Sequence, residues 1–407
     1  MNILLLLFLL SNVLGNPICN CTHIKSNKEI NVKYNMNTTL GYGAQKNTML
    51  FDALGFISGD KNADTFLPPG KVVDYFGFQY LRDNDLSSNG HNTDFLTKAA
   101  NCFFTAIGGF NSSIGQKLFD LAISQYIRIN QLGMMRLTPI EIFRNYSELQ
   151  INKTKLEQWG KDFWTLDGEL AIERAKTYGE IILSFTTDQK NYFNTKIKEK
   201  GMIDWPNEII DIKITDNYTN IIKQELKTAI MTFASDILSW YIGSQEADIY
   251  FCPERFGTMF GSFYMKDAPA VGNAGYNIST SLTSNGGEEF LKILTSEQQQ
   301  RILSILPENS ILLNKIVILR TQIVKKLRNS LSNNEIDTNG ILQLSKQIGV
   351  YDMDINYLFA TTFIIINKLL LISQKEQIDN LRFNILNNDT TLLHPSRPYL
   401  YATSISI

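Results

Sequence analysis

Apolar residues recur at intervals of three and four over most of the chain after about residue 94, with polar residues between them. This spacing places apolar side chains on one face of a helix, whereas the alternation typical of strands is scarce. The pattern predicts helices at 94–103, 114–132, 140–150, 153–183, 217–251, 288–294, 311–331 and 341–372. The fold class predicted from the sequence is therefore all-α.

Three helix starts carry the signature of a capping box, in which an N-cap hydroxyl and a residue three positions on satisfy each other's backbone groups. Thr186 with Gln189 and Thr295 with Gln298 fit this signature, and Ile372-Ser373-Gln374-Lys375-Glu376 gives a third example. The helix at 217–251 should end at Cys252-Pro253, because a residue before proline is disfavoured in the helical region.

One aromatic and glycine-containing pattern, FGxxYxxD, occurs twice. Phe76–Asp83 reads FGFQYLRD and Phe260–Asp267 reads FGSFYMKD, and similar helical patterns follow each copy. An acidic triplet also recurs, at Asp167–Glu169 and Asp352–Asp354. The repetition predicts two tandem homologous helical halves, a duplicated bundle with long irregular loops.

The resulting organisation has six parts. It comprises a signal peptide at 1–15, an irregular amino-terminal segment at 16–70, a first helical repeat at 71–205, a connecting long helix at 206–258, a second repeat at 259–387 and a tail at 388–407.

The first residues indicate export from the cell. The apolar run Ile3–Leu10 is too short to span a bilayer, and Val13 and Gly15 are small enough for cleavage after Gly15. Eight Asn-x-Ser/Thr sequons are consistent with a secreted glycoprotein. They are at Asn20, Asn37, Asn111, Asn145, Asn152, Asn217, Asn277 and Asn388, of which Asn145 and Asn152 are the best candidates because they lie in a polar connector.

Four cysteines in an oxidising compartment favour disulfide bonds over a metal site. Cys19 and Cys21 are too close for an unstrained bridge, so we expect each to pair with one of Cys102 and Cys252, in an order left open.

Net charge and hydropathy exclude some partners. The net charge of −2 and the absence of a basic run argue against nucleic acid. Ile355–Ile372 is nearly long enough to cross a membrane, but Asn356, Asn367 and Lys368 would be costly in lipid, so it is predicted as a buried core helix without stable membrane insertion.

No common catalytic motif is present. The three histidines are far apart, and the chain has no Gly-x-Ser-x-Gly elbow, P-loop or dinucleotide fingerprint. The remaining candidates are polar residues near the repeated pattern, which could form an acidic pocket for a divalent cation or supply two carboxylates for acid/base chemistry on a sugar. They are Asp83, His91, Asp94, Asp248, Glu254 and Asp267.

A structural role for these residues is the stronger alternative, in which Arg82–Asp83 and Lys266–Asp267 hold loops in place and Glu254–Arg255 pairs locally. Ser244, Asp248 and Cys252 would share one helical face. Asp167, Glu169, Glu173 and Arg174 are expected on an exposed helix face. The aromatics of the repeated pattern, Phe76, Phe78, Tyr80, Phe260, Phe263 and Tyr264, are expected in core packing rather than in a ligand groove.

Two resemblances follow from these motifs. Leu294–Gln298, and less closely Phe185–Gln189, resembles the LTxxQ motif of periplasmic helical chaperones. The segments Phe76–Phe95 and Trp240–Thr283 resemble a family of secreted helical proteins of unassigned function from bacteria and social amoebae. That second resemblance implies secretion and a duplicated helical fold, and it brings no catalytic residues.

The sequence thus predicts a secreted, glycosylated helical protein with a non-catalytic role in binding an extracellular protein or ligand. The alternative is an extracellular carboxylate-dependent enzyme, such as a glycan hydrolase, or a metal-binding protein. No cofactor is indicated.

Overall fold

The computed structural model describes residues 42–59, 75–76, 95–144, 151–199, 210–215, 217–249, 269–270, 273–277, 286–332 and 334–387. These residues are almost entirely helical, and the predicted all-α class is confirmed. The one sheet among them is a short antiparallel ribbon of β1 (Pro269–Ala270) and β2 (Asn273–Asn277), within a segment that we expected to be a loop.

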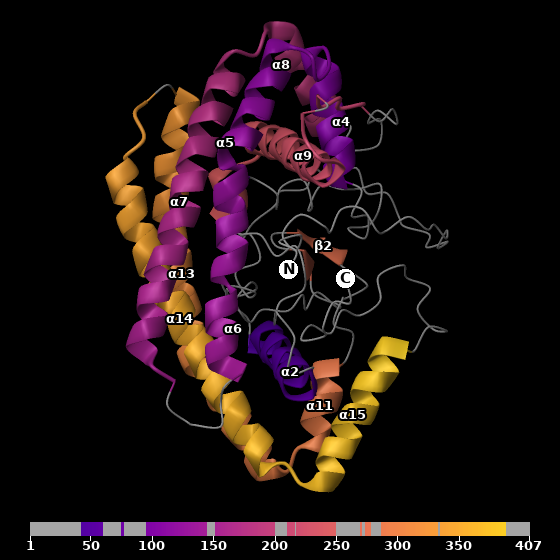
Figure 1. Cartoon of the computed structure of the whole chain (residues 1–407), viewed down its shortest axis with the longest axis vertical. Helices are drawn as coiled ribbons and strands as arrows, with labels where there is room; N and C mark the ends of the chain where they lie inside the picture. Colours follow the sequence, from indigo (N-terminus) through magenta and orange to yellow (C-terminus); the bar gives the residue numbers. More distant parts are fainter. Residues whose placement is uncertain are drawn as a thin grey trace.

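The two longest helices form the spine of the molecule. α7 (Lys153–Leu183) and α14 (Thr338–Leu369) pack against each other more extensively than any other two elements in the described chain. They run in opposite directions, because Gly160 faces Gly349 whereas Gly179, further along α7, faces Ser330, which precedes α14. α13 (Leu306–Leu327) lies along α14, and α5 (Ser113–Met135) lies along α7 (Figure 1).

Two features of sequence and packing hold the spine together. Gly160 and Gly349 lack side chains, so the two helix backbones touch there. Nearby, the fully buried carboxylate of Asp352 accepts hydrogen bonds from Trp164 Nε1 at 2.8 Å and from Asn356 Nδ2 at 3.1 Å. The Asp352 carboxylate in this apolar interface is therefore paired, as burial requires.

Each end of the spine carries a helical cluster made from both halves of the sequence (Figure 1). At one end α4 (Phe95–Ile107) packs on α9 (Asn220–Ile242), next to α8 (Thr187–Phe193). At the other end α2 (Tyr42–Ser58) packs on α11 (Gly286–Ile293), next to α15 (Ile372–Asn387). An early helix and a late helix thus pair at both ends.

Shorter elements join these helices. They are α6 (Leu137–Arg144), the π-helix η1 (Asn194–Glu199), α10 (Gln245–Ile249), α12 (Ser296–Leu303) and the 3₁₀ helix η3 (Arg328–Ser332).

Two of the three predicted capping boxes form, those of Thr186 with Gln189 and of Thr295 with Gln298. The third prediction, on Ser373, is wrong in detail. α15 begins at Ile372, and the side chain of Gln374 accepts a hydrogen bond from the backbone N–H of Leu371 at 3.0 Å. Leu371 has no side-chain group that could complete the box.

Two other boundaries also differ from the sequence prediction. The segment 16–70 was expected to be irregular, yet it contains the 17-residue helix α2, whose Met49, Leu50 and Phe51 are buried. The long connecting helix within 206–258 is divided, because α9 ends at Ile242 with Gly243 as its C-cap and the short α10 follows.

Ile355–Ile372 behaves as predicted for a core helix up to Leu369, because most of its side chains are buried within α14. By length and composition alone, a different stretch of the described chain, Ser296–Ser332, is apolar enough to cross a membrane. It comprises α12, α13 and η3, and 44% of its most apolar window is buried inside the protein.

Candidate functional site

Asp248 is the one predicted pocket residue that lies within the described residues, and two arginines surround it. Its side chain is fully buried, and Arg328 Nε donates a hydrogen bond to Oδ2 at 2.5 Å. Its backbone carbonyl accepts bonds from Arg320 Nε at 2.9 Å and Nη2 at 2.7 Å. Asp248 therefore ties the short helix α10 to α13 and η3.

The arginines also pack on aromatic rings. Arg320 is itself fully buried, and its guanidinium lies 4.5 Å from the centre of the Tyr75 ring. Arg328 lies 5.7 Å from the ring of Trp240, the last-turn aromatic of α9. A cation over an aromatic face is stabilised most when both are removed from water, as Arg320 and Tyr75 are.

Tyr75 directly precedes the first FGxxYxxD pattern. Burial raises the pKa of its phenol far above the usual value, and the Asp167 carboxylate raises it further against the opposing effect of Arg320. Among the described residues, neither its hydroxyl nor the indole N–H of Trp240 has a hydrogen-bond partner. A phenol held neutral in this way is a poor general base at physiological pH.

Phe76, the first residue of the pattern, is a core residue. It packs edge-on against Trp240 with ring centres 5.2 Å apart and against Tyr178 at 4.9 Å. Ser239 Oγ donates a hydrogen bond to the Phe76 carbonyl at 2.5 Å. The prediction that the aromatics of the pattern serve core packing is confirmed for Phe76. Phe78, Tyr80, Phe260, Phe263 and Tyr264 lie outside the described residues.

The other five predicted pocket residues, Asp83, His91, Asp94, Glu254 and Asp267, also lie outside the described residues. So do Cys252, Arg82, Arg255 and Lys266. Across the part of the chain that is described, no three His, Cys, Asp or Glu side chains converge as a metal site would require.

The charged group on α7 was predicted to be solvent-exposed, and this is wrong. Glu173 is half-buried against α5, where its carboxylate accepts hydrogen bonds from Arg128 Nη1 at 2.6 Å and Gln125 Nε2 at 3.3 Å. Arg174 donates to Gln125 Oε1 at 2.8 Å and lies over the Phe233 ring. Burial alone would raise the pKa of Glu173, but the bonds from Arg128 and Gln125 hold it below its usual value.

Cys102 is a buried free thiol on α4 within the described part of the chain, and its predicted disulfide with Cys19 or Cys21 stays a prediction. Burial raises the pKa of this thiol to about 12, against a hydrogen bond with Tyr192 and the charge of Lys196. The thiol is therefore protonated and inert at neutral pH. Its predicted partners Cys19 and Cys21 are outside the described residues.

Three of the eight sequon asparagines, Asn111, Asn152 and Asn217, have described side chains, and all three are exposed. Asn152 is also the N-cap of α7, because its Oδ1 accepts a hydrogen bond from Lys155 N. Asn277 lies in β2, and Asn20, Asn37, Asn145 and Asn388 lie outside the described residues.

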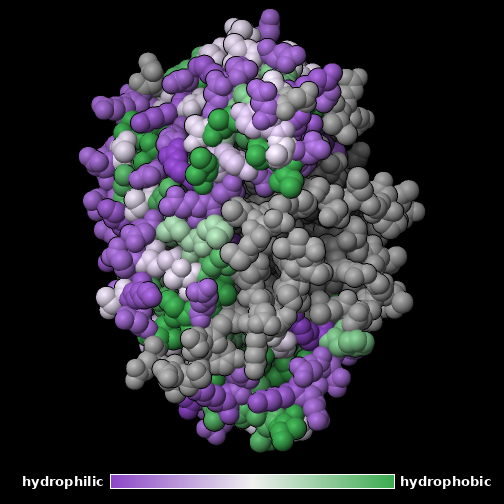
Figure 2. All heavy atoms as spheres, viewed as in Figure 1, coloured by the Kyte–Doolittle hydropathy of each residue, from purple (hydrophilic) through white to green (hydrophobic). Residues whose placement is uncertain are grey.

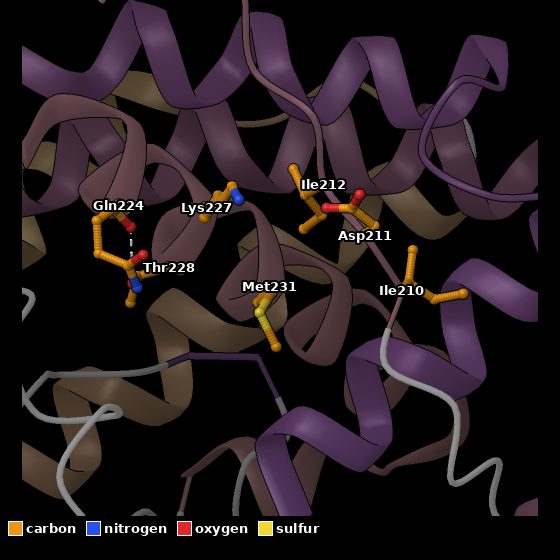
Figure 3. A pocket seen from close by; sticks show the side chains of 7 residues that line it. All are labelled: Ile210, Asp211, Ile212, Gln224, Lys227, Thr228 and Met231. Carbon is orange, nitrogen blue, oxygen red and sulfur yellow. Dashed lines mark hydrogen bonds between the residues drawn. The ribbon is translucent and has the colours of Figure 1, made fainter. Parts of the chain in front are cut away.

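A shallow depression of about 240 Å³ lies between α9 and the extended segment 210–212 (Figure 3). Its lining residues are Ile210, Asp211, Ile212, Gln224, Lys227, Thr228 and Met231. Asp211 is largely exposed and pairs with Lys213 on the surface. The depression is smaller and more open than typical ligand pockets, which usually exceed about 300 Å³ and enclose their ligand.

Comparison with known proteins finds no family model, curated protein or solved structure that matches this chain. The arrangement at Asp248 must therefore be interpreted from its chemistry. Sequence analysis missed Tyr75, Arg320 and Arg328, because a buried ion pair between residues far apart in the chain leaves no local spacing signal.

Proposed function

We propose that this protein is a secreted, glycosylated helical protein with a non-catalytic role in extracellular binding. The observation that carries the proposal is the full burial of Asp248 between Arg320 and Arg328. A catalytic or metal-binding carboxylate must meet substrate, water or an ion, whereas this one is paired with Arg328, and Arg320 holds the backbone carbonyl of the same residue. Of the predicted pocket residues, Asp248 is therefore assigned a structural role in this proposal.

Export and glycosylation remain part of the proposal. The apolar run Ile3–Leu10 supports a cleaved signal, and the exposure of Asn111, Asn152 and Asn217 supports glycan attachment. A glycan on Asn152 is chemically compatible with its capping role. Glycosylation uses the side-chain nitrogen, which leaves Oδ1 free to accept the hydrogen bond from Lys155 N.

We also infer that the chain arose from two related halves. Residues 52–83 and 236–267 align without a gap, so that Asp52, Gly59 and Asp64 correspond to Asp236, Gly243 and Asp248. The FGxxYxxD patterns fall in the same alignment.

Equivalent contacts at the two ends of the spine support this origin. Gln189 Nε2 donates to the carbonyl of Ala106 in α4, and Gln374 Nε2 donates to that of Ile293 in α11. The helix packing is also equivalent at the two ends. α4 of the first half packs on α9 of the second, and α11 of the second half packs on α2 of the first.

The test is native mass spectrometry of the protein purified after secretion, with Asp248→Asn beside wild type. We expect glycan masses on the wild type and a lower thermal midpoint for Asp248→Asn, because one charge of a buried pair has lost its partner. Any bound small species should be the same in both proteins. Asp211→Asn, which removes an exposed carboxylate, is the matched control.

A metal ion or small molecule that is bound by wild type and lost from a well-folded Asp248→Asn variant would refute the proposal. It would favour the alternative of a carboxylate-dependent enzyme or metal-binding protein.

A further inference from the structure

The turn between α14 and α15 presents three large apolar side chains to solvent. Leu369 is 46% exposed, Leu371 is 62% exposed and Ile372 is 79% exposed. Figure 1 shows this turn at one extremity of the long axis, and Figure 2 shows hydrophobic side chains gathered at the same end. We call Leu369, Leu371 and Ile372 the apolar corner.

The fold does not require this chemistry. At the other end of the spine, α7 turns into α8 through Ser184, Phe185 and Thr186, followed by Thr187. Phe185 is buried there, as Leu370 is buried in the turn between α14 and α15. The buried anchor is thus apolar in both turns. At the α7–α8 turn one apolar side chain, Leu183, is exposed beside three hydroxyl residues, whereas three apolar side chains are exposed at the other turn.

Leu371 is also an unfavourable choice for the helix that follows it. It occupies the N-cap of α15, where leucine is among the poorest residues and threonine among the favourable ones. Gln374 already supplies the N3 half of a capping box, and only the N-cap hydroxyl is missing. Leu371 thus weakens the start of α15 and is exposed to solvent, which indicates that it serves a role other than folding.

The small size and projecting shape of the corner favour a lipid surface over a protein partner. Three partly exposed side chains offer on the order of a few hundred Å², whereas a stable protein interface needs about 800 Å² on each partner. A projecting apolar turn can instead insert into the headgroup region of a bilayer without a matching concave surface. The exposed Lys368 and Lys375 flank the corner within one helical turn, and their ammonium groups can reach lipid phosphates. The acidic Glu376 and Glu297 are also exposed nearby.

We propose that the apolar corner is a membrane-contact site, through which the folded protein docks on the surface of a phospholipid bilayer. The side chains of Leu371 and Ile372 enter the interface, while α14 and α15 remain outside it. This inference concerns a surface separate from the Asp248 cluster, so it can fail while the proposal made for Asp248 holds.

The test is flotation of the full-length protein with phosphatidylcholine vesicles and with vesicles that also contain phosphatidylserine. Wild type should float with vesicles, and Leu371→Thr/Ile372→Thr should bind at least tenfold more weakly. That variant copies the turn at Thr186-Thr187, so it should complete the capping box and unfold at the same or a higher temperature. Ile127→Thr, at another strongly exposed apolar position, is the matched control and should bind as wild type.

Stronger flotation with phosphatidylserine would support the proposal and add a role for Lys368 and Lys375. Equal flotation with both vesicles would support it through the apolar side chains alone. Three outcomes would overturn it: no flotation of wild type, undiminished flotation of the double variant, or a wild-type dimer in light scattering that the double variant abolishes without any vesicle binding.

Discussion

Replacing Gly349 with alanine should force the two spine helices apart. A Cβ atom at this position would lie 2.2 Å from the carbonyl oxygen of Gly160 and 2.9 Å from Lys161 N. Both are backbone atoms of α7, so no side-chain rotation can relieve the contact. The reciprocal distance, from a Cβ at Gly160 to the Gly349 oxygen, is 2.3 Å. Ordinary contact distances would require α7 and α14 to separate by roughly 1 Å.

The free energy of unfolding should fall as a result. Overpacking in a core typically costs about 1–3 kcal/mol, and a clash with rigid backbone in the largest helix interface belongs at the upper end of that range. Alanine regains up to about 1 kcal/mol over glycine through helix propensity. We therefore expect Gly349→Ala to be destabilised by about 2 kcal/mol.

Urea unfolding followed by circular dichroism at 222 nm would measure this change. Gly43→Ala is the control, because Gly43 lies in α2 and a Cβ atom added there would meet no described atom within 4 Å. It should be neutral or stabilising by up to about 1 kcal/mol. If Gly349→Ala were as stable as Gly43→Ala, the close approach of the spine helices would be refuted.

Two further predictions follow from hydrogen-bonded groups. Gln189→Ala and Gln374→Ala should each lower the free energy of unfolding by about 1–2 kcal/mol, because each side chain serves a helix start and a carbonyl of a neighbouring helix; thermal unfolding that shows no cost for either would contradict the equivalence of the two ends. The pKa of Glu173 is lowered in the folded protein, so its contribution is present above the unfolded pKa of about 4.3 and is lost as pH falls through the folded value. Acid unfolding of Glu173→Gln should therefore show a weaker loss of stability between pH 5 and pH 3 than wild type, and identical acid profiles would refute a charged Glu173–Arg128 pair.

Local patterns in the sequence predicted most of the helices correctly. α5, α7 and the capping boxes at Thr186 and Thr295 follow from periodicity and cap residues, which act within a few positions of one another. α2 escaped prediction because its buried residues, including Met49, Leu50 and Phe51, are consecutive and give little one-sided periodicity.

The candidate site was accessible to sequence analysis only in part. The pattern singled out Asp248 as a carboxylate near a repeated motif, and it left open whether the residue was functional or structural. Arg320 and Arg328 support the structural alternative, and no spacing rule links them to Asp248 because they belong to α13 and η3.

By itself the sequence determined the all-α class, most of the main helices and the two capping boxes at Thr186 and Thr295, because these depend on interactions between near neighbours in the chain. The tertiary structure alone decided that α4 packs on α9 and α11 on α2, that Glu173 pairs with Arg128 of α5, and that Leu371 and Ile372 remain exposed. These outcomes depend on which surfaces meet when the helices pack, and burial and charge pairing between distant residues are properties of that assembled arrangement.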